Sequence, residues 1–461
     1  MNTLALALRN LLRNRRRSLA TLLAMVLGLV ALLLFGGYRA NILYGMQTGF
    51  VQYSGHLQVQ HRGWFEEGGD NPAAYAIAQP QRLIDAIRHD AVLAPMLSVV
   101  TPTLQLGGIA GQFEAGLSRS VLATGLVATE QEQLRQWNDH GMLSYAQPLG
   151  LVGTGPDAAV VGTGVSRRLL LCGLPGAPAC RADAGGPAAT GGELPADIAA
   201  LAALQAPAAT GPRGRIELLA SSESGAPNVA SLQVLRANNL GVKAIDDVYL
   251  AMHLPLAQRL VYGGGPAGVT AIVVQLRHTA QMPVARARLQ VLLADLAGDQ
   301  PLQVLGFDTL NPIYGQTDEF MASMFGFIAL LIGAIVLFTI GNTMSAAVLE
   351  RTAEIGTLRA MGLRRSGIRR LFLCEALLLG LAGGALGLAL ALAAAAAINH
   401  SGWSWTPPGY SYAYLVQVRV AEDGALLAGC LAGLLLVTTA SAWWPARRAA
   451  RMQIVDALRH S

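Results

Sequence analysis

The chain has 461 residues, of which 53% are hydrophobic and 13% are charged, and its formal net charge is +5. This length leaves room for a membrane bundle together with one or two soluble units. The positive charge does not indicate a nucleic-acid partner, because most of the clustered arginines flank long apolar runs.

Four long apolar runs divide the chain, at residues 19–37, 321–348, 371–398 and 425–444. A bilayer core of about 30 Å needs roughly 20 apolar residues in helical form, and each run has about that length with almost no charge inside it. The segment between the first and second runs has normal polar content, with alternating strand and helix signals. The sequence therefore predicts an α-helical membrane protein with four transmembrane helices in a one-plus-three arrangement and a large α+β domain between the first and second.

Arginines gather in three short segments beside these runs. They are Arg9, Arg13, Arg15, Arg16 and Arg17 before the first run; Arg351, Arg359, Arg364, Arg365, Arg369 and Arg370 between the second and third; and Arg447, Arg448, Arg451 and Arg459 after the fourth. Cytoplasmic flanks of transmembrane helices accumulate Lys and Arg. We therefore expect both termini in the cytoplasm and the large domain outside it.

The alternative for the first run is a cleaved signal peptide. The run is longer than an ordinary signal core, and no small-x-small cleavage site follows it before Tyr38. A retained first helix that continues outward to residue 46 as a stalk is the better interpretation.

The exported domain alternates strand and helix patterns. Strands are expected at 56–60, 97–107, 121–124, 271–276 and 302–305, and helices at 80–93, 254–261 and 282–296. Between 173 and 214 the chain becomes rich in Ala, Gly and Pro and its periodicity fades, which indicates an irregular loop with one short helix near 196–204.

Four cysteines fall into two groups. Cys172 and Cys180 bracket a Pro/Gly-rich stretch of the exported domain, where a disulfide is favoured over two free thiols. A metal site is the alternative, but neither a His nor a second cysteine pair lies near enough in the sequence to complete four ligands. Cys374 and Cys430 belong to the apolar runs, where thiols behave as small apolar residues.

Catalytic patterns are weak. The adjacent acids Asp246 and Asp247, like Glu66 and Glu67, would point to opposite faces of a strand and lack a neighbouring His, so surface charge is the expected role. The single lysine, Lys243, does not stand in a P-loop pattern. The sequence therefore predicts no catalytic site, no metal site and no cofactor in this chain.

The link between the second and third runs carries the most specific motif. Residues 350–362 read Glu-Arg-Thr-Ala-Glu-Ile-Gly-Thr-Leu-Arg-Ala-Met-Gly, which closely resembles the cytoplasmic signature of ABC transporter permeases of the FtsX/MacB/LolC-LolE type, the type VII or mechanotransmission family. The start at 9–14 and the C-terminal tail are similar to the same family. The tail residues that carry this resemblance are Pro445, Arg447, Arg448 and Arg451.

As a helix, this link would place Ile355, Leu358 and Met361 along one apolar stripe. Such a helix can fit a groove on another protein; the alternative is a helix in the lipid interface, which Gly356 and Gly362 disfavour because glycine weakens an isolated helix. The resemblance implies a coupling helix that docks on an ATPase. The docking residues it implies are Glu350, Arg351, Glu354, Ile355, Gly356, Leu358, Arg359, Met361 and Gly362.

Two further features lie in the third run. Gly380, Gly383, Gly384 and Gly387 form two small-xxx-small registers, which predict close contact with neighbouring helices. Glu375 is an acid near the arginine-rich end of a span, where a charge is costly, and we expect a structural role for it over an ion or proton site.

The expected organisation begins with a cytoplasmic amphipathic segment (1–17), followed by transmembrane helix 1 and its stalk (18–46). A periplasmic α+β domain similar to the MacB core follows (47–316), with a loop-rich insertion around 141–242. The rest of the chain comprises the stalk and helix 2 (317–349), the coupling helix (350–370), helix 3 (371–398), a short extracytoplasmic loop (399–423), helix 4 (424–444) and a cytoplasmic tail (445–461).

The resemblance implies a non-catalytic permease subunit in the bacterial inner membrane. Its expected partners are a cytoplasmic ABC ATPase dimer that binds the ATP and Mg²⁺, a second permease as a homodimer or paralogous heterodimer, the lipid bilayer, and a periplasmic adaptor or lipoprotein chaperone. The implied task is export or extraction of a lipoprotein, peptide or small hydrophobic molecule. The alternative is a non-transporting FtsX-type regulator or sensor; a membrane-bound enzyme is disfavoured because no catalytic constellation stands in the sequence.

Overall fold

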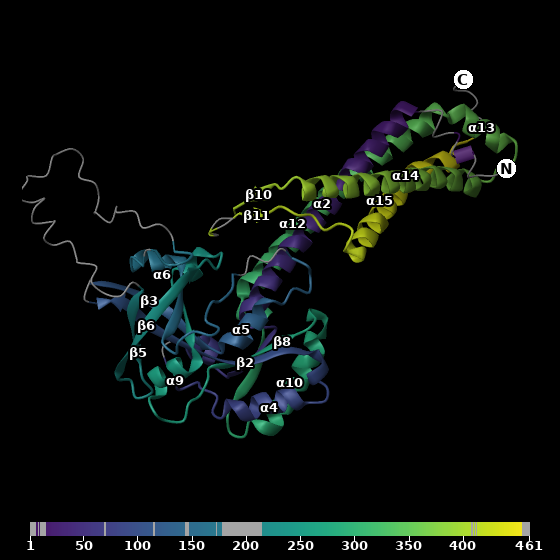
Figure 1. Cartoon of the computed structure of the whole chain (residues 1–461). Coiled ribbons are helices and arrows are strands. Elements are labelled where there is room, and N and C mark those ends of the chain that lie inside the picture. Colours follow the sequence, from purple (N-terminus) through teal and green to yellow (C-terminus); the bar gives the residue numbers. More distant parts are fainter. Residues whose placement is uncertain are drawn as a thin grey trace, which may run out of the picture. The chain divides into compact units, whose positions relative to one another are not determined.

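The computed structural model describes residues 6–7, 9, 15–68, 71–113, 116–142, 147–171, 173–177, 214–406, 409, 411 and 413–453. The chain divides into two compact units. One comprises Met1–Tyr44, Gly315–Trp405 and Tyr414–Ser461, and the other Gly45–Tyr314 and Thr406–Ala413. The first is called the membrane unit below and the second the α+β unit (Figure 1).

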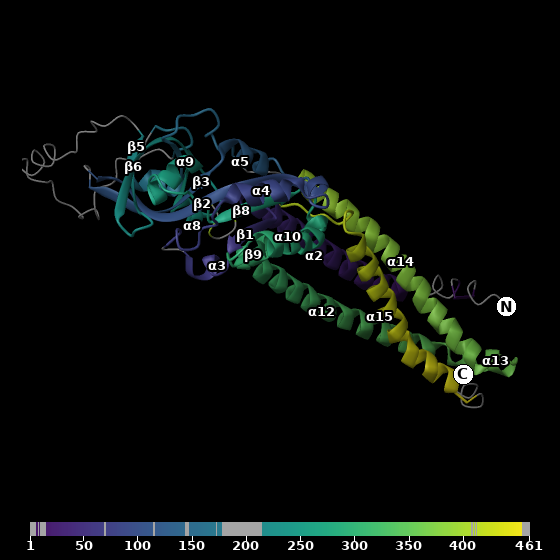
Figure 2. The ribbon, with the colours of Figure 1, turned by 90° about the horizontal axis from the view of Figure 1, so that it is seen from below.

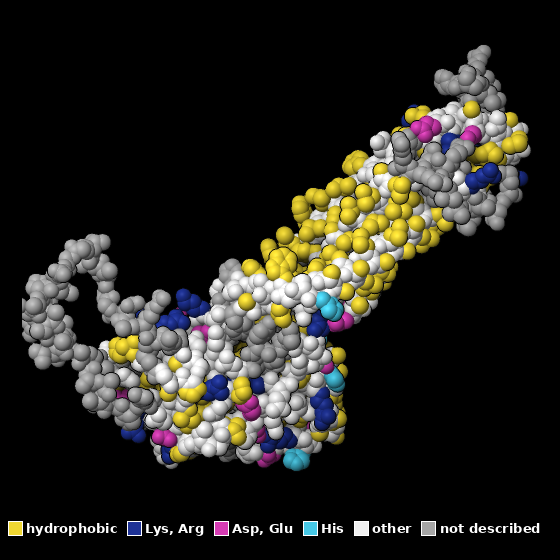
Figure 3. Space-filling view, turned by 45° about the horizontal axis from the view of Figure 1, so that its top comes forward, with side chains coloured by type: hydrophobic (Ala, Val, Ile, Leu, Met, Phe, Trp, Pro, Cys, Tyr) yellow, Lys and Arg dark blue, Asp and Glu magenta, His cyan; other side chains and the backbone are white. Residues whose placement is uncertain are grey.

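Among the described residues, four helices of the chain are long and apolar enough to cross a membrane: α2 (Arg15–Ser54), α12 (Pro312–Glu350), α14 (Arg365–His400) and α15 (Gly424–Arg451). In hydrocarbon a helix satisfies its own backbone groups, so these Leu- and Ala-rich runs fold as unbroken helices. Many of their large apolar side chains face outward, including Phe338, Leu330 and Leu436, and yellow side chains cover this unit in Figure 3. The predicted four apolar helices are confirmed.

The helices α2 and α12 pack side by side in opposite directions within the membrane unit. Matched contacts run along them: Thr21 with Thr343, Gly28 with Ile332, Phe35 with Phe325, and Arg39 with Asp318. The two threonine hydroxyls are 3.1 Å apart, and the phenylalanine rings stack with centroids 6.3 Å apart. The two helices therefore form one antiparallel pair in this unit.

Glycines on α14 bring two other helices close. A Cβ at Gly387 would lie 2.9 Å from Leu29 Cδ2 of α2, and a Cβ at Gly380 would lie 3.2 Å from Leu435 Cδ2 of α15. Gly383 and Gly384 continue these two faces toward α2 and α15 respectively. The close helix contact expected from the small-residue registers is confirmed, and Figure 2 shows α14 beside α15.

Within the described residues, the α+β unit is built on one sheet of nine strands. They are β1 (Leu57–His61), β2 (Leu97–Gln112), β3 (Leu117–Leu126), β4 (Ala158–Gly162), β5 (Arg215–Ser221), β6 (Pro227–Asn238), β7 (Tyr249–His253), β8 (Ala271–Leu276) and β9 (Leu302–Gly306). Their order is β3-β7-β4-β6-β5-β2-β8-β1-β9, and β3 also pairs with β2.

The long strand β2 organises this sheet because its two halves have different partners. Its first half pairs with β8, where Val100 lies opposite Val274, and its second half pairs with β3 and β5. The strands β3, β7, β4, β6, β5 and β2 therefore close into a ring, while β8, β1 and β9 extend the sheet from the other half of β2.

Helices cover both parts of the sheet. The helix α9 (Leu254–Tyr262) packs on the ring strands, and Gly125 on β3 leaves room for it, because a Cβ there would lie 2.3 Å from Ala257 Cβ. The helices α4 (Pro80–His89) and α10 (Met282–Leu296) pack on each other and on β2 and β9. The shorter helices are α3 (Trp64–Glu67), α5 (Ala128–Arg135), α6 (Thr163–Arg168), α8 (Lys243–Asp246) and α11 (Phe307–Leu310).

The sequence located most elements of the first and last thirds of this unit. The strand at Ala271–Leu276 and the helix at Met282–Leu296 have the predicted bounds. The strands β4, β5, β6 and β7 were not predicted. The proposed disulfide cysteines, Cys172 and Cys180, lie outside the described residues, as does most of the predicted loop around 173–214.

One expectation about the acids is wrong. Asp246 is 2% exposed, so it is not a surface charge. Its carboxylate accepts hydrogen bonds from the Leu240 N–H at 2.7 Å and the Ser411 hydroxyl at 3.1 Å, and burial raises its pKa above the ordinary value. The carboxylate thereby joins Ser411 to Leu240 within the α+β unit.

Candidate functional site

The motif between the second and third apolar runs forms a separate short helix, α13 (Thr352–Ala360). It begins where α12 ends, because Arg351 leaves helical geometry with φ −107° and ψ 22°. It ends in a turn at Gly362, whose φ of +92° is a left-handed value that glycine adopts without a Cβ clash. The Leu363 N–H donates to the Leu358 carbonyl at 3.1 Å, which closes the helix end.

The inner face of α13 packs on the chain itself. Ile355 is 3% exposed and belongs to the apolar cluster that includes Ile368 and Phe372 of α14 and Ala446 of α15. Leu358 packs against the same cluster. Ile355 and Leu358, which the sequence predicted to contact a partner protein, therefore pack against the protein's own helices. The short links at both ends of α13 place it against the bundle.

A buried ion pair fixes the start of α13. Arg351 Nη1 donates to Glu375 Oε1 of α14 at 3.1 Å, and the two side chains are 8% and 4% exposed. Removing one partner of such a pair leaves a buried charge uncompensated and destabilises a fold strongly. Glu375 thus has a structural contact, because it pairs with Arg351 at the junction of α12 and α13.

A second polar contact fixes the end of α13. The Arg359 guanidinium donates to the main-chain carbonyl of Met452, just beyond the C-terminal end of α15. Together with the Arg351–Glu375 pair, this contact ties α13 to both α14 and α15. Both ends of α13 are therefore held against long helices of the bundle.

The outer face of α13 is exposed. It presents Ala353, Glu354, Thr357, Ala360 and Met361, and Met361 is 74% exposed. The Thr357 hydroxyl is bonded within the helix, to the carbonyls of Ala353 and Glu354. This face, here called the α13 outer face, is small and apolar at its centre with one acid beside it.

The other predicted motif residues are spread around this helix. Glu350 ends α12 and is exposed, whereas Gly356 is buried. Pro445 is buried inside α15, and Arg447, Arg448 and Arg451 are exposed along its last turns. Arg448 lies over the Trp444 ring at 5.9 Å.

The α+β unit contains a polar network that the sequence did not reveal. His56 is fully buried; its Nδ1 accepts the Leu276 N–H at 3.0 Å, so its Nε2 carries the proton and donates to Thr279 Oγ1 at 3.2 Å. Gln47 donates to the same hydroxyl at 2.6 Å. Burial lowers the pKa of His56 to about 4, so the ring is neutral near pH 7.

A cavity of about 550 Å³ lies beside this network, lined by Gln47, Thr279, Met282, Arg286 and Phe307 among others. Arg286 pairs with Asp308 at 3.2 Å across its wall. Within the part of the chain that the structure describes, no three His, Cys, Asp or Glu side chains lie close enough to hold a metal ion.

Comparison with known proteins agrees with these features. Residues 324–454 match the family model described as FtsX-like permease C-terminal. The macrolide export ATP-binding/permease protein MacB of Sodalis glossinidius is 29% identical over 249 residues, which are 52% of this chain and 36% of that protein. MacB of Escherichia coli is 32% identical over 197 residues, 42% of this chain and 28% of that protein.

The fold and the helical motif together define a membrane protein with four long apolar helices and a large α+β domain. The C-terminal part of the chain, residues 324–454, belongs to the FtsX-like permeases, and the chain is similar to ABC transporter permeases of the MacB type. The matched region spans about a third of the length of the Sodalis relative, and less of the Escherichia coli relative.

Proposed function

We propose that this chain is the permease subunit of an ABC transporter that transmits ATP-driven motion from a separate cytoplasmic ATPase to its exported α+β unit. The α13 outer face is the surface on which the ATPase docks. The transported or extracted molecule is a lipoprotein, a peptide or a small hydrophobic compound. A second permease, a copy or a paralogue, completes the transporter.

The observation that carries this proposal is that one face of α13 is packed on the helix bundle and the opposite face is exposed. Its inner face is tied to α14 and α15 by Arg351, Ile355 and Arg359, whereas its outer face is exposed. A helix that is fixed to the bundle on one face and exposed on the other can bind an ATPase and transmit its displacement to α14 and α15 without unfolding.

The lengths of two helices support the transmission step. α2 has 40 residues and α12 has 39, so each is about 60 Å long, roughly twice the thickness of the bilayer core. The antiparallel contacts from Thr21–Thr343 to Arg39–Asp318 stiffen the pair. Each helix also has residues in both units, so displacement along the pair reaches the α+β unit.

The arginine distribution supports placement in the bacterial inner membrane, with α13 and both termini in the cytoplasm and the α+β unit in the periplasm. No P-loop pattern stands in these 461 residues, so in this proposal ATP and Mg²⁺ are bound by residues outside them.

Docking is tested with Thr357→Trp and Met361→Asp, which change the α13 outer face and leave the inner contacts in place. We expect both variants to lose co-purification with the partner ATPase and permease-dependent ATP hydrolysis, by tenfold or more, while the bundle stays folded. Val284→Trp is the matched control, because Val284 is 54% exposed on a helix of the α+β unit. Normal association of both α13 variants would disprove docking at this face.

A further inference from the structure

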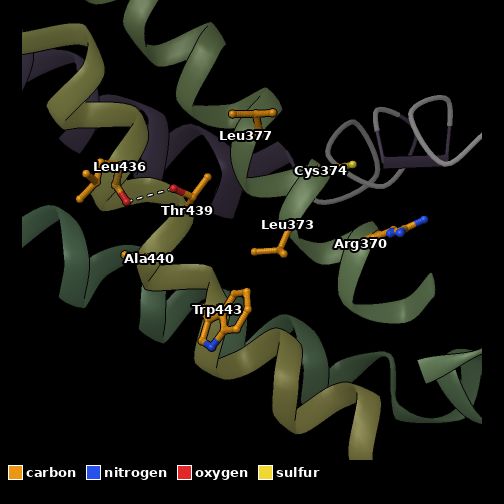
Figure 4. A pocket seen from close by; sticks show the side chains of 8 residues that line it. All are labelled: Arg370, Leu373, Cys374, Leu377, Leu436, Thr439, Ala440 and Trp443. Atoms are coloured by element: carbon orange, nitrogen blue, oxygen red, sulfur yellow. Dashed lines mark hydrogen bonds between the residues drawn. The ribbon is translucent and has the colours of Figure 1, made fainter. Parts of the chain in front are cut away.

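The membrane unit contains a groove of about 540 Å³ between α14 and α15. Its walls are apolar: Leu373, Cys374 and Leu377 come from α14, and Leu436, Thr439 and Ala440 come from α15 (Figure 4). Thr439 does not make the wall polar, because its hydroxyl donates to the carbonyls of Leu435 and Leu436 on its own helix.

One end of the groove is polar and basic. Arg370 lines it there and is exposed, and Trp443 stands opposite on α15 with 48% exposure. The neighbouring Arg369 lies over the Trp443 ring at 5.3 Å, which orients the indole. Tryptophan and arginine at the end of apolar helices mark the level of the lipid headgroups.

The other end of the groove is closed by helix contact. Gly380, one turn beyond Leu377, allows α15 to approach so closely that a Cβ there would meet both Leu435 and Thr438 at 3.2 Å. The distance along α14 from Arg370 to Leu377 is about 10 Å, at 1.5 Å per residue. The groove thus has a basic mouth, an apolar channel of that length and a closed floor.

We propose that this groove binds an anionic phospholipid, with its phosphate on the Arg370 guanidinium and the first part of one acyl chain between α14 and α15. The outward-facing walls lie in a segment that is long and apolar enough to be surrounded by lipid, so an acyl chain is the molecule at hand to fill them. A guanidinium binds phosphate oxygens in bidentate fashion.

Charge complementarity selects the anionic headgroup. The segment from Ile355 to Cys374 contains Arg359, Arg364, Arg365, Arg369 and Arg370 and no Asp or Glu. Clustered arginines at a membrane surface attract phosphatidylglycerol and other anionic lipids over zwitterionic ones. Since α14 also carries Glu375 of the α13 ion pair, a bound lipid would brace the helix to which α13 is tied.

Native mass spectrometry of the purified full chain tests the proposal, with phosphatidylglycerol and phosphatidylcholine of identical acyl chains as probes. Wild type should retain phosphatidylglycerol at least fivefold more than phosphatidylcholine. Arg370→Gln should abolish this preference, and Ala440→Trp should lower retention of both lipids by filling the groove. Arg451→Gln is the control, because this arginine ends α15 outside the arginine-rich segment and does not line the groove, and it should behave as wild type. Equal phosphatidylglycerol retention by wild type, Arg370→Gln and Ala440→Trp would overturn the proposal.

Alkylation of Cys374 gives a second readout, with adducts located by peptide mass spectrometry. Phosphatidylglycerol should slow maleimide addition at Cys374 severalfold in wild type but not in Arg370→Gln, and Cys430, which does not line the groove, should be unaffected. Protection by soluble glycerol phosphate alone would show a site for free phosphate and overturn the lipid assignment. An oxidative Cys374–Cys374 crosslink between two copies in membranes would show a protein interface and overturn it as well.

Discussion

At the scale of single residues, the Arg351–Glu375 ion pair and the His56 side chain each join two elements of the fold. Arg351 and Glu375 hold the start of α13 on α14. His56 joins β1 to the end of β8 through the Leu276 amide and Thr279. The Arg351–Glu375 pair and His56 are both buried, so the cost of leaving a partner unpaired is high.

Glu375→Gln should loosen α13 because Arg351 then loses its buried carboxylate partner. We expect a local cost of about 3 kcal/mol and faster hydrogen exchange of the α13 amides. The double variant Arg351→Met/Glu375→Met should restore slow exchange, since apolar side chains of similar volume replace the pair. Unchanged exchange in Glu375→Gln would show that the pair does not hold the helix.

Acid should weaken the contact between β1 and β8 through His56. The folded-state pKa, about 4, lies below the ordinary 6.5, so the unfolded state binds more protons between these values and stability falls as the pH is lowered through this window. From pH 7.5 to pH 5 the loss should be about 2 kcal/mol.

The measurement is hydrogen exchange of the β8 amides at both pH values, corrected for intrinsic rates. His56→Asn, whose amide oxygen can accept the Leu276 N–H, should be less stable at pH 7.5 but lose much less on acidification. An equal pH effect in both proteins would assign the acid sensitivity to another group.

At the scale of elements, the glycines of α14 set helix packing in the membrane unit. Gly387 faces Leu29 of α2 without space for a side chain, whereas a Cβ added at Gly433 on α15 would have no atom of another helix within 4 Å. Both glycines lie in apolar stretches rich in Leu, Ala and Gly, so only their neighbours in the folded structure distinguish them.

Gly387→Leu should therefore destabilise the purified protein by about 1–3 kcal/mol through overpacking against α2. The measurement is the thermal unfolding temperature, which should fall, and the temperature at which aggregation begins, which should fall with it. Gly433→Leu should be neutral or slightly stabilising, because leucine favours a helix over glycine. Equal transitions for the two variants would contradict the packing of α14 on α2.

At the scale of the whole molecule, membrane orientation is the property that the proposed function requires. Reporter fusions after Met46 and near Gly409 should be active outside the cytoplasm, and fusions after Gly362 and at Ser461 should be active inside it. A cytoplasmic reporter signal at Gly409 would remove the proposed four-span orientation and leave α14 and α15 to be reassigned.

The sequence by itself determined the features that depend on local composition. The apolar runs give α12 and α14 because hydrocarbon permits few backbone alternatives to a helix, and the strong periodicity of 282–296 gives α10. The motif at 350–362 likewise identified α13 as the candidate site.

Only the tertiary structure decided which face of each element is buried. It turned Ile355 inward, buried Asp246 beneath Ser411, and paired Arg351 with Glu375 from 24 residues away. It also assembled β4 to β7 with β2 and β3 into a ring, since short strands gain their stability from partners distant in the sequence and not from their own residues. The groove at Arg370 and Trp443 exists for the same reason: α14 and α15 must be folded against each other before their side chains can form its two walls.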